Sequence, residues 1–285
     1  NHHLFQQVWM NKSPRFTIKD SPKYIKFLSS LNMHALTIIP CNTLSLHDNM
    51  RKYAMALTPN SILFLRYKTV KTDISILRDI PLMNIVAVSY DDSNNCYSIE
   101  TKNRDTFAIQ SPDFEIFFHE MNIFFTRLMY QFPKGREIKV SGFTPIKMQK
   151  LAAQPPNISL LRYEATVVQY SSNLSLELGR NFFDFETTSR CFFNFEKYGD
   201  PVMHPNILSS PLIAEKMLSV ISFKGIAPKI VCKAIRTFLK YTKSLSTIIL
   251  EEYEDIQFEQ FNFETIPNPN VVSWTFKNVF TSNKY

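Results

Sequence analysis

The amino-acid sequence predicts a multidomain α+β protein in which a bent β sheet, closed by a C-terminal helix, precedes an α/β repeat solenoid. Three observations predict this fold class. About seven short strand-like segments follow one another between residues 35 and 110. One long amphipathic segment then begins at Ser111. An apolar pattern recurs at regular intervals in the last third of the chain.

The strand-like segments are rich in β-branched and aromatic residues and are separated by turn residues. They are expected at residues 35–40, 53–57, 62–67, 74–78, 85–90, 97–101 and 106–110. The Thr58-Pro59-Asn60 turn joins the second segment to the third as a hairpin.

Two helices flank these strands. Ser21-Pro22 is an N-cap followed by proline at the first helical position, which predicts a short helix inside an N-terminal extension, residues 1–33. The long helix begins at Ser111-Pro112. Its apolar stripe consists of Phe114, Phe117, Met121, Phe124 and Leu128. The order of antiparallel strands closed by one helix resembles a pleckstrin-homology domain over residues 34–132, although a lipocalin-like or other small barrel shares several of these signals.

Glycine and proline residues then interrupt the periodic segments and indicate a domain boundary. We assign residues 133–172 to a helical linker, with a small helix at 146–153 and a second helix near 160–170. An alternating segment, Leu174, Leu176 and Leu178, favours a strand immediately after it.

Residues 173–285 contain a repeat of the form apolar-x-x-apolar-x-apolar-x-x-apolar. Its copies are Leu218-x-x-Ile221-x-Phe223-x-x-Ile226, Leu245-x-x-Ile248-x-Leu250-x-x-Tyr253 and Val271-x-x-Trp274-x-Phe276-x-x-Val279, with a weaker copy at Leu176-x-Leu178-x-x-Asn181. The three copies begin about 27 and then about 26 residues apart, within the leucine-rich-repeat period. A helical stretch at 230–239 supplies the outer helix of such a repeat. The alternative is a generic α/β segment with amphipathic elements.

This domain order resembles the N-terminal half of the CARMIL family, actin regulators that link capping protein to myosin-I. The likeness is most specific in Leu161-Arg162-Tyr163-Glu164-Ala165 through Tyr170, and in residues 217–256. The resemblance implies a membrane-associated pleckstrin-homology domain, an arc of repeats and support for a homodimer. It also implies that capping protein and myosin-I bind largely through regions outside this sequence.

Basic residues near the first strand-to-strand loops are candidate contacts for anionic lipids. They are Arg51, Lys52, Arg66, Lys68 and Lys71, with His47 nearby. The alternative is ordinary solvated charge. The acidic run Glu251, Glu252, Glu254 and Asp255 is the candidate protein-docking group, because it follows a predicted repeat strand and suits a basic partner.

The aromatic residues around the predicted first repeat form a second notable group: Phe182, Phe183, Phe185, Phe192, Phe193 and Phe195. We expect them to form the core that joins the linker to the first repeat. An exposed aromatic docking patch is the alternative.

Composition argues against catalysis. The chain has 5 glycines and lacks a glycine-rich phosphate loop, and its 4 cysteines form no C-x-x-C pair. The histidines have no metal-ligand spacing, so we expect no metal, no cofactor and no enzymatic activity. The cysteines are expected to be buried thiols.

A net charge of +7 suits an acidic partner, but no nucleic-acid signature is present. No window has the length of a membrane span, so we expect a cytoplasmic protein that associates peripherally with the plasma membrane. The leading function is a non-catalytic scaffold of the actin cytoskeleton. The alternative is a lipid- or protein-binding adaptor with the same two modules and no connection to actin.

Overall fold

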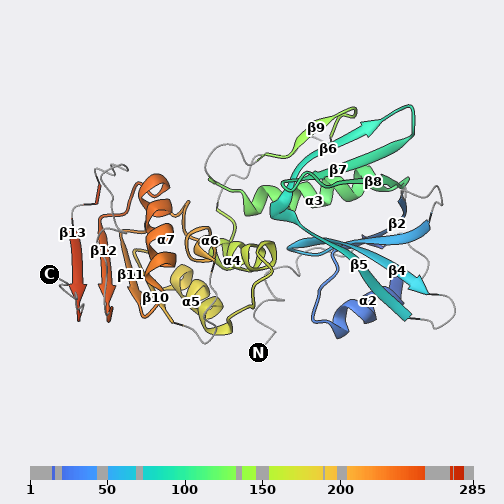
Figure 1. Cartoon of the computed structure of the whole chain (residues 1–285). Coiled ribbons are helices and arrows are strands. Elements are labelled where there is room, and N and C mark those ends of the chain that lie inside the picture. The colour runs from blue at the N-terminus through green and yellow to red at the C-terminus, as the bar shows by residue number, and fades with distance from the viewer. Residues whose placement is uncertain are drawn as a thin grey trace. The chain divides into compact units, whose positions relative to one another are not determined.

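The structure is a computed structural model of the chain (Figure 1). It describes residues 15–16, 21–43, 51–68, 73–132, 137–145, 154–188, 190–197, 204–253, 270–271 and 273–278. The chain forms two compact units. Unit 1 contains residues 1–129 and 135–154, and unit 2 contains residues 130–134 and 155–285.

Unit 1 is built on one large sheet whose seven longer strands are antiparallel. These strands are β2 (Thr37–Thr43), β3 (Arg51–Leu57), β4 (Ser61–Lys68), β5 (Asp73–Pro81), β6 (Ile85–Asp91), β7 (Cys96–Thr101) and β8 (Thr106–Gln110). All seven predicted strand segments are confirmed, and so is the β3–β4 hairpin.

The strand order is β5-β4-β3-β2-β8-β7-β6-β9. β2 pairs with β3 along its whole length but with β8 only at Asn42 and Thr43. The sheet therefore bends where these two halves meet. Two very short strands pair in parallel at its margins: β1 (Arg15–Phe16) with β2, and β9 (Lys139–Ser141) with β6.

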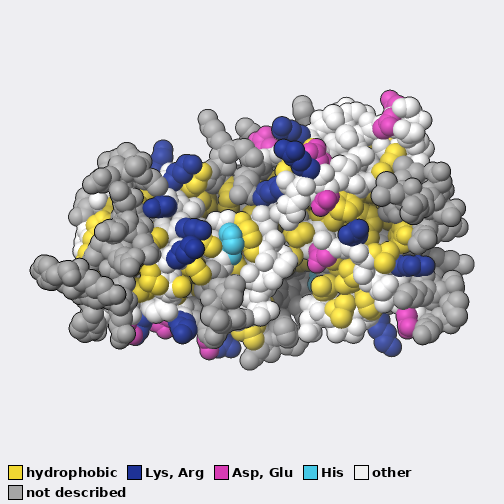
Figure 2. Space-filling model, viewed as in Figure 1, with side chains coloured by type: hydrophobic (Ala, Val, Ile, Leu, Met, Phe, Trp, Pro, Cys, Tyr) yellow, Lys and Arg dark blue, Asp and Glu magenta, His cyan; other side chains and the backbone are white. Residues whose placement is uncertain are grey.

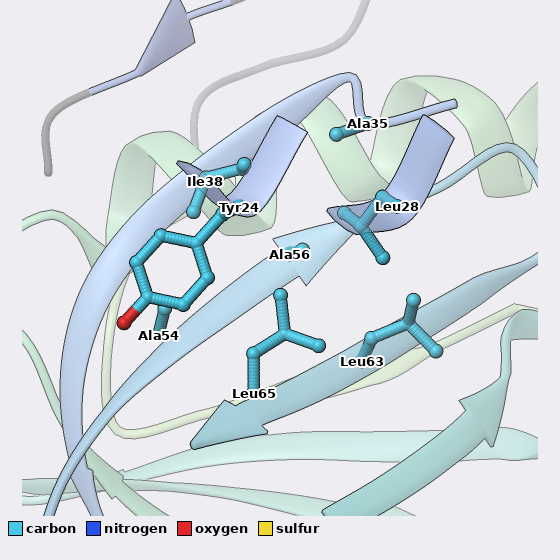
Figure 3. Packing of buried hydrophobic residues seen from close by; sticks show 8 residues of the cluster. All are labelled: Tyr24, Leu28, Ala35, Ile38, Ala54, Ala56, Leu63 and Leu65. Atoms are coloured by element: carbon cyan, nitrogen blue, oxygen red, sulfur yellow. The ribbon is translucent and has the colours of Figure 1, made fainter. Parts of the chain in front are cut away.

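Helix α2 (Ser21–Ser30) covers one face of the β2–β4 half, as Figure 3 shows. Tyr24 and Leu28 of this helix pack against alternate strand residues. Those strand residues, together with Ala35 before β2, are Ile38, Ala54, Ala56, Leu63 and Leu65. The intervening residues are buried too, and the ring of Phe64 lies 6.2 Å from that of Phe107 on β8. The strands of this half are therefore buried on both faces, which explains their nearly continuous apolar sequence.

Helix α3 (Phe114–Leu128) closes unit 1. All five residues of its predicted apolar stripe are buried, together with Phe118 and Phe125. The Ser111 hydroxyl donates a 2.6 Å hydrogen bond to the carbonyl of Pro40, which ties the start of the helix to β2. A bent antiparallel sheet closed by a C-terminal helix is the pleckstrin-homology-like arrangement predicted from the sequence.

Unit 2 alternates helices with short strands. Its elements are α4 (Ile158–Gln169), α5 (Leu176–Thr187), β10 (Phe192–Glu196), α6 (Pro205–Ser209), β11 (Val220–Lys224), α7 (Pro228–Tyr241), β12 (Thr247–Glu251) and β13 (Ser273–Lys277). The strands form a parallel sheet in sequence order, β10-β11-β12-β13. They begin at residues 192, 220, 247 and 273, so the spacing is 26 to 28 residues.

Each of the first three strands turns two apolar side chains toward the helices. These pairs are Phe193 and Phe195, Ile221 and Phe223, and Ile248 and Leu250, and all six residues are buried. The ring of Phe195 lies 6.2 Å from Phe238 of α7, and the ring of Phe193 lies 4.7 Å from Phe182 of α5. The helices on one side of unit 2 and the strands on the other side thus share one hydrophobic core.

The turn after the last three strands repeats as well. Gly225, Glu252 and Asn278, which directly follow β11, β12 and β13, have positive φ angles of 66°, 57° and 52°. The backbone conformation therefore recurs with the same period as the strands.

Two predictions for this region are wrong. The segment containing Leu174, Leu176 and Leu178 is not a strand, and the weak repeat copy that begins at Leu176 lies on helix α5. Ser175 caps this helix by accepting a hydrogen bond from the Leu178 amide, and Leu178, Phe182 and Phe185 are buried at helical spacing. The strand that precedes the first full repeat is instead β10. The predicted helix at 146–153 lies outside the described residues.

Candidate functional site

Three of the predicted anionic-lipid residues occupy backbone positions at one end of a hairpin. Arg51 and Lys52 begin β3, and Lys68 ends β4. Because β3 and β4 are antiparallel, these positions lie at the same end of the sheet. Arg66, whose side chain is half-buried, pairs with Ser75 of β5. Lys71 and the side chains of Arg51, Lys52 and Lys68 lie outside the described residues, as does His47.

The predicted docking acids Glu251 and Glu252 are already engaged within unit 2. Glu251 accepts a 3.0 Å hydrogen bond from the Lys277 ammonium group of β13. Glu252 forms an ion pair with Lys224 of β11 at 3.0 Å and raises the pKa of that lysine. Glu254 and Asp255 lie outside the described residues.

These pairs belong to a row of charges across the sheet. Glu196, Lys224, Glu251 and Lys277 occupy equivalent last positions of neighbouring strands, so the sign alternates from strand to strand. Opposite charges on adjacent strands stabilise their register. A basic partner that docked on Glu251 or Glu252 would have to compete with Lys277 and Lys224.

Sequence reasoning missed a basic stripe on helix α7. Its members are spaced at i, i+4, i+7, i+11 and i+14 and all are exposed: Lys229, Lys233, Arg236, Lys240 and Lys243, the last just beyond the helix. The helix contains no acidic residue, and its opposite face is buried. Figure 2 shows Lys and Arg side chains gathered over α7. Helical spacing applied to the cations, and not only to the apolar residues, would have found this stripe.

A buried polar cluster lies beside α4. The Arg162 guanidinium is 1% exposed, donates to the carbonyl of Tyr130 and lies 5.0 Å from the centre of the Phe132 ring. Burial lowers the pKa of Arg162 to about 10, and the nearby carboxylates of Glu215 and Glu186 oppose this shift.

Glu186 completes this polar cluster. It accepts a hydrogen bond from the Ser159 amide, while the Ser159 hydroxyl bonds to Glu215 at 3.3 Å. Burial raises the pKa of Glu186, and the charge of Glu215 adds to the increase. Within the described residues, the second carboxylate oxygen of Glu186 has no hydrogen-bond partner. The cluster is a structural core of unit 2, because its groups bond to one another and to the backbone.

The aromatic residues behave mainly as a core. Phe182, Phe185, Phe193 and Phe195 are buried, whereas Phe192 is 47% exposed. The cysteines are free thiols. Cys41, Cys96 and Cys232 are buried as expected, but Cys191 is exposed, which corrects the prediction for that residue. Burial raises the pKa of Cys41 to about 12 and that of Cys232 to about 11, so both thiols are protonated at neutral pH.

Metal ligation and membrane crossing find no support in the described parts of the chain. There, no three or more His, Cys, Asp or Glu residues are placed to hold a metal ion together. None of the helices in these parts combines the length and the apolar character needed to cross a bilayer.

No family model matches the chain, and no curated protein matches it. Solved structures do resemble part of it. The C-terminal domain of an unknown protein from Leishmania infantum is 14% identical, with 35% of this chain and 93% of that domain covered and a TM-score of 0.28. The Slm1 PH domain in complex with phosphoserine is 17% identical, with 32% of this chain and 94% of that domain covered and a TM-score of 0.26.

The N-terminal PH domain of human ARAP2 is 16% identical, with 41% of this chain and 91% of that domain covered and a TM-score of 0.28. These scores are low. The pleckstrin-homology-like description of unit 1 therefore rests on its own strand order and closing helix.

Proposed function

We propose that this chain is a non-catalytic scaffold of the CARMIL type. In this proposal, unit 1 and the basic stripe on α7 of unit 2 contact an anionic membrane, and unit 2 also supplies the first leucine-rich repeats and docks other proteins. The observation that carries the proposal is the order of unit 2, in which four parallel strands follow one another in sequence order. Repeat arrays of this kind present extended surfaces that bind partners.

Further features of unit 2 support a leucine-rich-repeat identity. The strand spacing of 26 to 28 residues lies within that repeat's range. A left-handed residue follows β11, β12 and β13 in turn, and α7 connects β11 to β12 on the core side. The sequence departs from the consensus at Tyr253, which stands where Asn or Cys is usual and is buried.

Membrane contact is supported by the distribution of cations. The stripe on α7 gives unit 2 an exposed basic surface, and in unit 1 the backbone places Arg51, Lys52 and Lys68 at one end of the β3–β4 hairpin. Most members of the stripe are lysines, whose compact charges can contact lipid phosphates without a shaped pocket. Near an anionic leaflet each such cation contributes roughly 1 kcal/mol to binding.

The first test is co-sedimentation with phosphatidylserine-containing vesicles over a salt series. One variant reverses the unit 1 charges at Arg51, Lys52, Lys68 and Lys71. A second variant carries Lys229→Glu, Lys233→Glu and Lys240→Glu on α7. Loss of three contacts worth roughly 1 kcal/mol each predicts roughly 100-fold weaker binding for the second variant.

The matched control reverses three exposed lysines outside both groups of cations, Lys23, Lys26 and Lys102. It changes the net charge as much as the α7 variant does. We expect it to sediment with vesicles much as the wild type does. If the wild type stays in the supernatant at low salt, the membrane role is lost and a protein-docking scaffold remains.

The connection to actin needs a separate test, because a lipid- or protein-binding adaptor unrelated to actin would share both units. The sequence of the complete coding region separates the two. The CARMIL type predicts further repeats and then a long, disordered, basic and proline-rich segment. A coding region that closes soon after Tyr285 favours the adaptor.

A further inference from the structure

The connector between the units returns to unit 1 and adds a strand to its sheet. After α3 the chain enters unit 2 at residues 130–134, and residues 135–154 then belong to unit 1 again. Within this segment β9 pairs in parallel with the outer edge of β6. The register places Lys139 opposite Ala87, Val140 opposite Val88 and Ser141 opposite Ser89.

Gly142, the next residue, approaches the edge of β6 too closely for any side chain. Its φ angle is +81°, and a Cβ atom added there would lie 2.1 Å from the carbonyl oxygen of Tyr90. Because the obstacle is backbone, no change of rotamer can relieve the clash. The site therefore selects glycine at this position of the added strand.

Phe143 then packs on aromatic residues from two other elements. Its ring meets Tyr97 of β7 edge-on at 5.5 Å and Phe118 of α3 edge-on at 5.3 Å. Tyr97 is itself held in place, because its ring stacks on Phe114 at 4.3 Å and its hydroxyl donates to Glu115 at 3.1 Å. We call Tyr97 and Phe118 the aromatic platform.

These features match the recognition mode in which an extended peptide adds a strand to an exposed sheet edge. In that mode the backbone of the added peptide pairs with the edge strand, and particular side chains supply specificity. Here the edge is β6, glycine is selected by Tyr90, and an aromatic side chain is selected by the platform. We propose that the β6 edge and the aromatic platform form a recognition site for extended peptides of the form apolar-x-Gly-aromatic, which residues 140–143 occupy in cis.

The internal occupant is suited to being replaced. β9 pairs with three of the seven residues of β6, and the side chains of Val140 and Phe143 are half-buried. A partner strand that paired with more of β6 would make additional backbone hydrogen bonds. It would have to overcome the effective concentration of the tethered segment, which is typically in the millimolar range for a binding segment on a short linker.

The probe for the experiment is a fluorescent peptide with the sequence of residues 137–145, Glu-Ile-Lys-Val-Ser-Gly-Phe-Thr-Pro. The protein is the full chain carrying Gly142→Val and Phe143→Ala, which removes the occupant. Fluorescence anisotropy should detect binding to this variant, and binding to the wild type should be at least roughly tenfold weaker because the tethered segment competes. A peptide in which alanine replaces the phenylalanine should also bind the variant at least tenfold more weakly.

Hydrogen exchange of the wild-type chain provides a second measurement that does not depend on the variant. With unlabelled peptide at several millimolar, exchange should become faster in residues 139–143 while residues 87–89 keep their protection. Absence of peptide binding to the variant, or equal binding of the alanine peptide, would overturn the proposal. Binding to the variant without displacement in the wild type would overturn it too, because residues 139–143 would then be a fixed structural strap. The test contains no lipid, so its outcome is independent of the membrane contact proposed above.

Discussion

Left-handed backbone positions are the clearest residue-scale signature of the repeat in unit 2. Gly225, Glu252 and Asn278 adopt positive φ angles at equivalent positions, although only one of them is glycine. An alanine Cβ at position 225 would lie 3.5 Å from the nearest atom, the Cβ of Lys197, so space is available. The cost of a side chain there is therefore conformational.

We accordingly expect Gly225→Ala to lower the free energy of unfolding by about 1 kcal/mol, since a left-handed L-residue costs about that much. Gly225→Asn should cost less than half as much, because asparagine tolerates this conformation and occupies it at position 278. Urea unfolding followed by circular dichroism measures both values. Equal stability of the alanine variant and the wild type would mean that the turn does not require its left-handed residue.

The buried carboxylate of Glu186 makes a prediction about pH. Its pKa is raised in the folded chain, above an ordinary value of 4.5, because burial penalises the charged form. Protonation of Glu186 therefore favours the folded state. This contribution to the free energy of unfolding is fully present below pH 4.5 and is lost as the pH rises through the pKa of the folded state. Glu186→Gln removes this loss and keeps an oxygen for the Ser159 amide.

The expected result is that Glu186→Gln gains stability relative to the wild type as the pH rises above 4.5. Urea titrations at a series of pH values, with Glu177→Gln at an exposed position of α5 as the matched control, measure the difference. If the difference in unfolding free energy between the wild type and the Glu186→Gln variant stays constant with pH, the raised pKa of Glu186 is contradicted.

At the scale of single elements, helix α2 decides whether the β2–β4 half of the sheet is buried on both faces. Leu28 is fully buried against this half, whereas Leu31, just beyond the helix, is 45% exposed. Leu28→Ala should lower the free energy of unfolding by about 2–5 kcal/mol, the usual cost of a cavity at a buried leucine.

Leu31→Ala is the matched control for that substitution and should change stability by less than about 0.5 kcal/mol. Urea unfolding measures both variants. A small effect of Leu28→Ala would mean that the packing of α2 on the β2–β4 half of the sheet contributes little to stability.

Sequence periodicity predicted most elements because their side chains repeat over several turns or strands. The stripe of α3 needed only the spacing of Phe114, Phe117, Met121, Phe124 and Leu128, all of which are buried. The segment from Leu174 to Leu178 was too short for its periodicity to distinguish a strand from a helix. Three alternating leucines resemble a strand, but Leu174 and Leu176 are exposed by 42% and 45%. The helical spacing that continues to Phe185 determines the conformation.

For the whole molecule, the predicted lipid-binding residues of unit 1 and the basic stripe on α7 make a joint prediction. If one bilayer engages both, binding is bivalent and the units reinforce each other through their covalent connection. A variant that combines the unit 1 reversals with those on α7 should then retain no salt-sensitive sedimentation with anionic vesicles. Each single set should leave measurable binding at low salt. Complete loss from either set alone would assign the contact to that unit.

The functional surfaces were less predictable than the elements. The cations of α7 are separated in sequence by apolar residues, so they form no visible run and become a stripe only on a helix. Glu251 and Glu252 look free in sequence, because their lysine partners stand 26 and 28 residues away on neighbouring strands. The contacts of Gly142 and Phe143 join a connector to β6, β7 and α3, and no local pattern indicates them.

The sequence by itself determined the seven strands of unit 1, its closing helix and the strands β11, β12 and β13 of unit 2. Local periodicity encodes such elements, since burial of one face imposes a spacing on neighbouring residues. The tertiary structure alone decided that α2 covers the sheet, that opposite charges meet across β11, β12 and β13, and that β9 returns to the edge of β6. Those contacts join residues far apart in the chain, and they form only when strand pairing and packing bring the segments together.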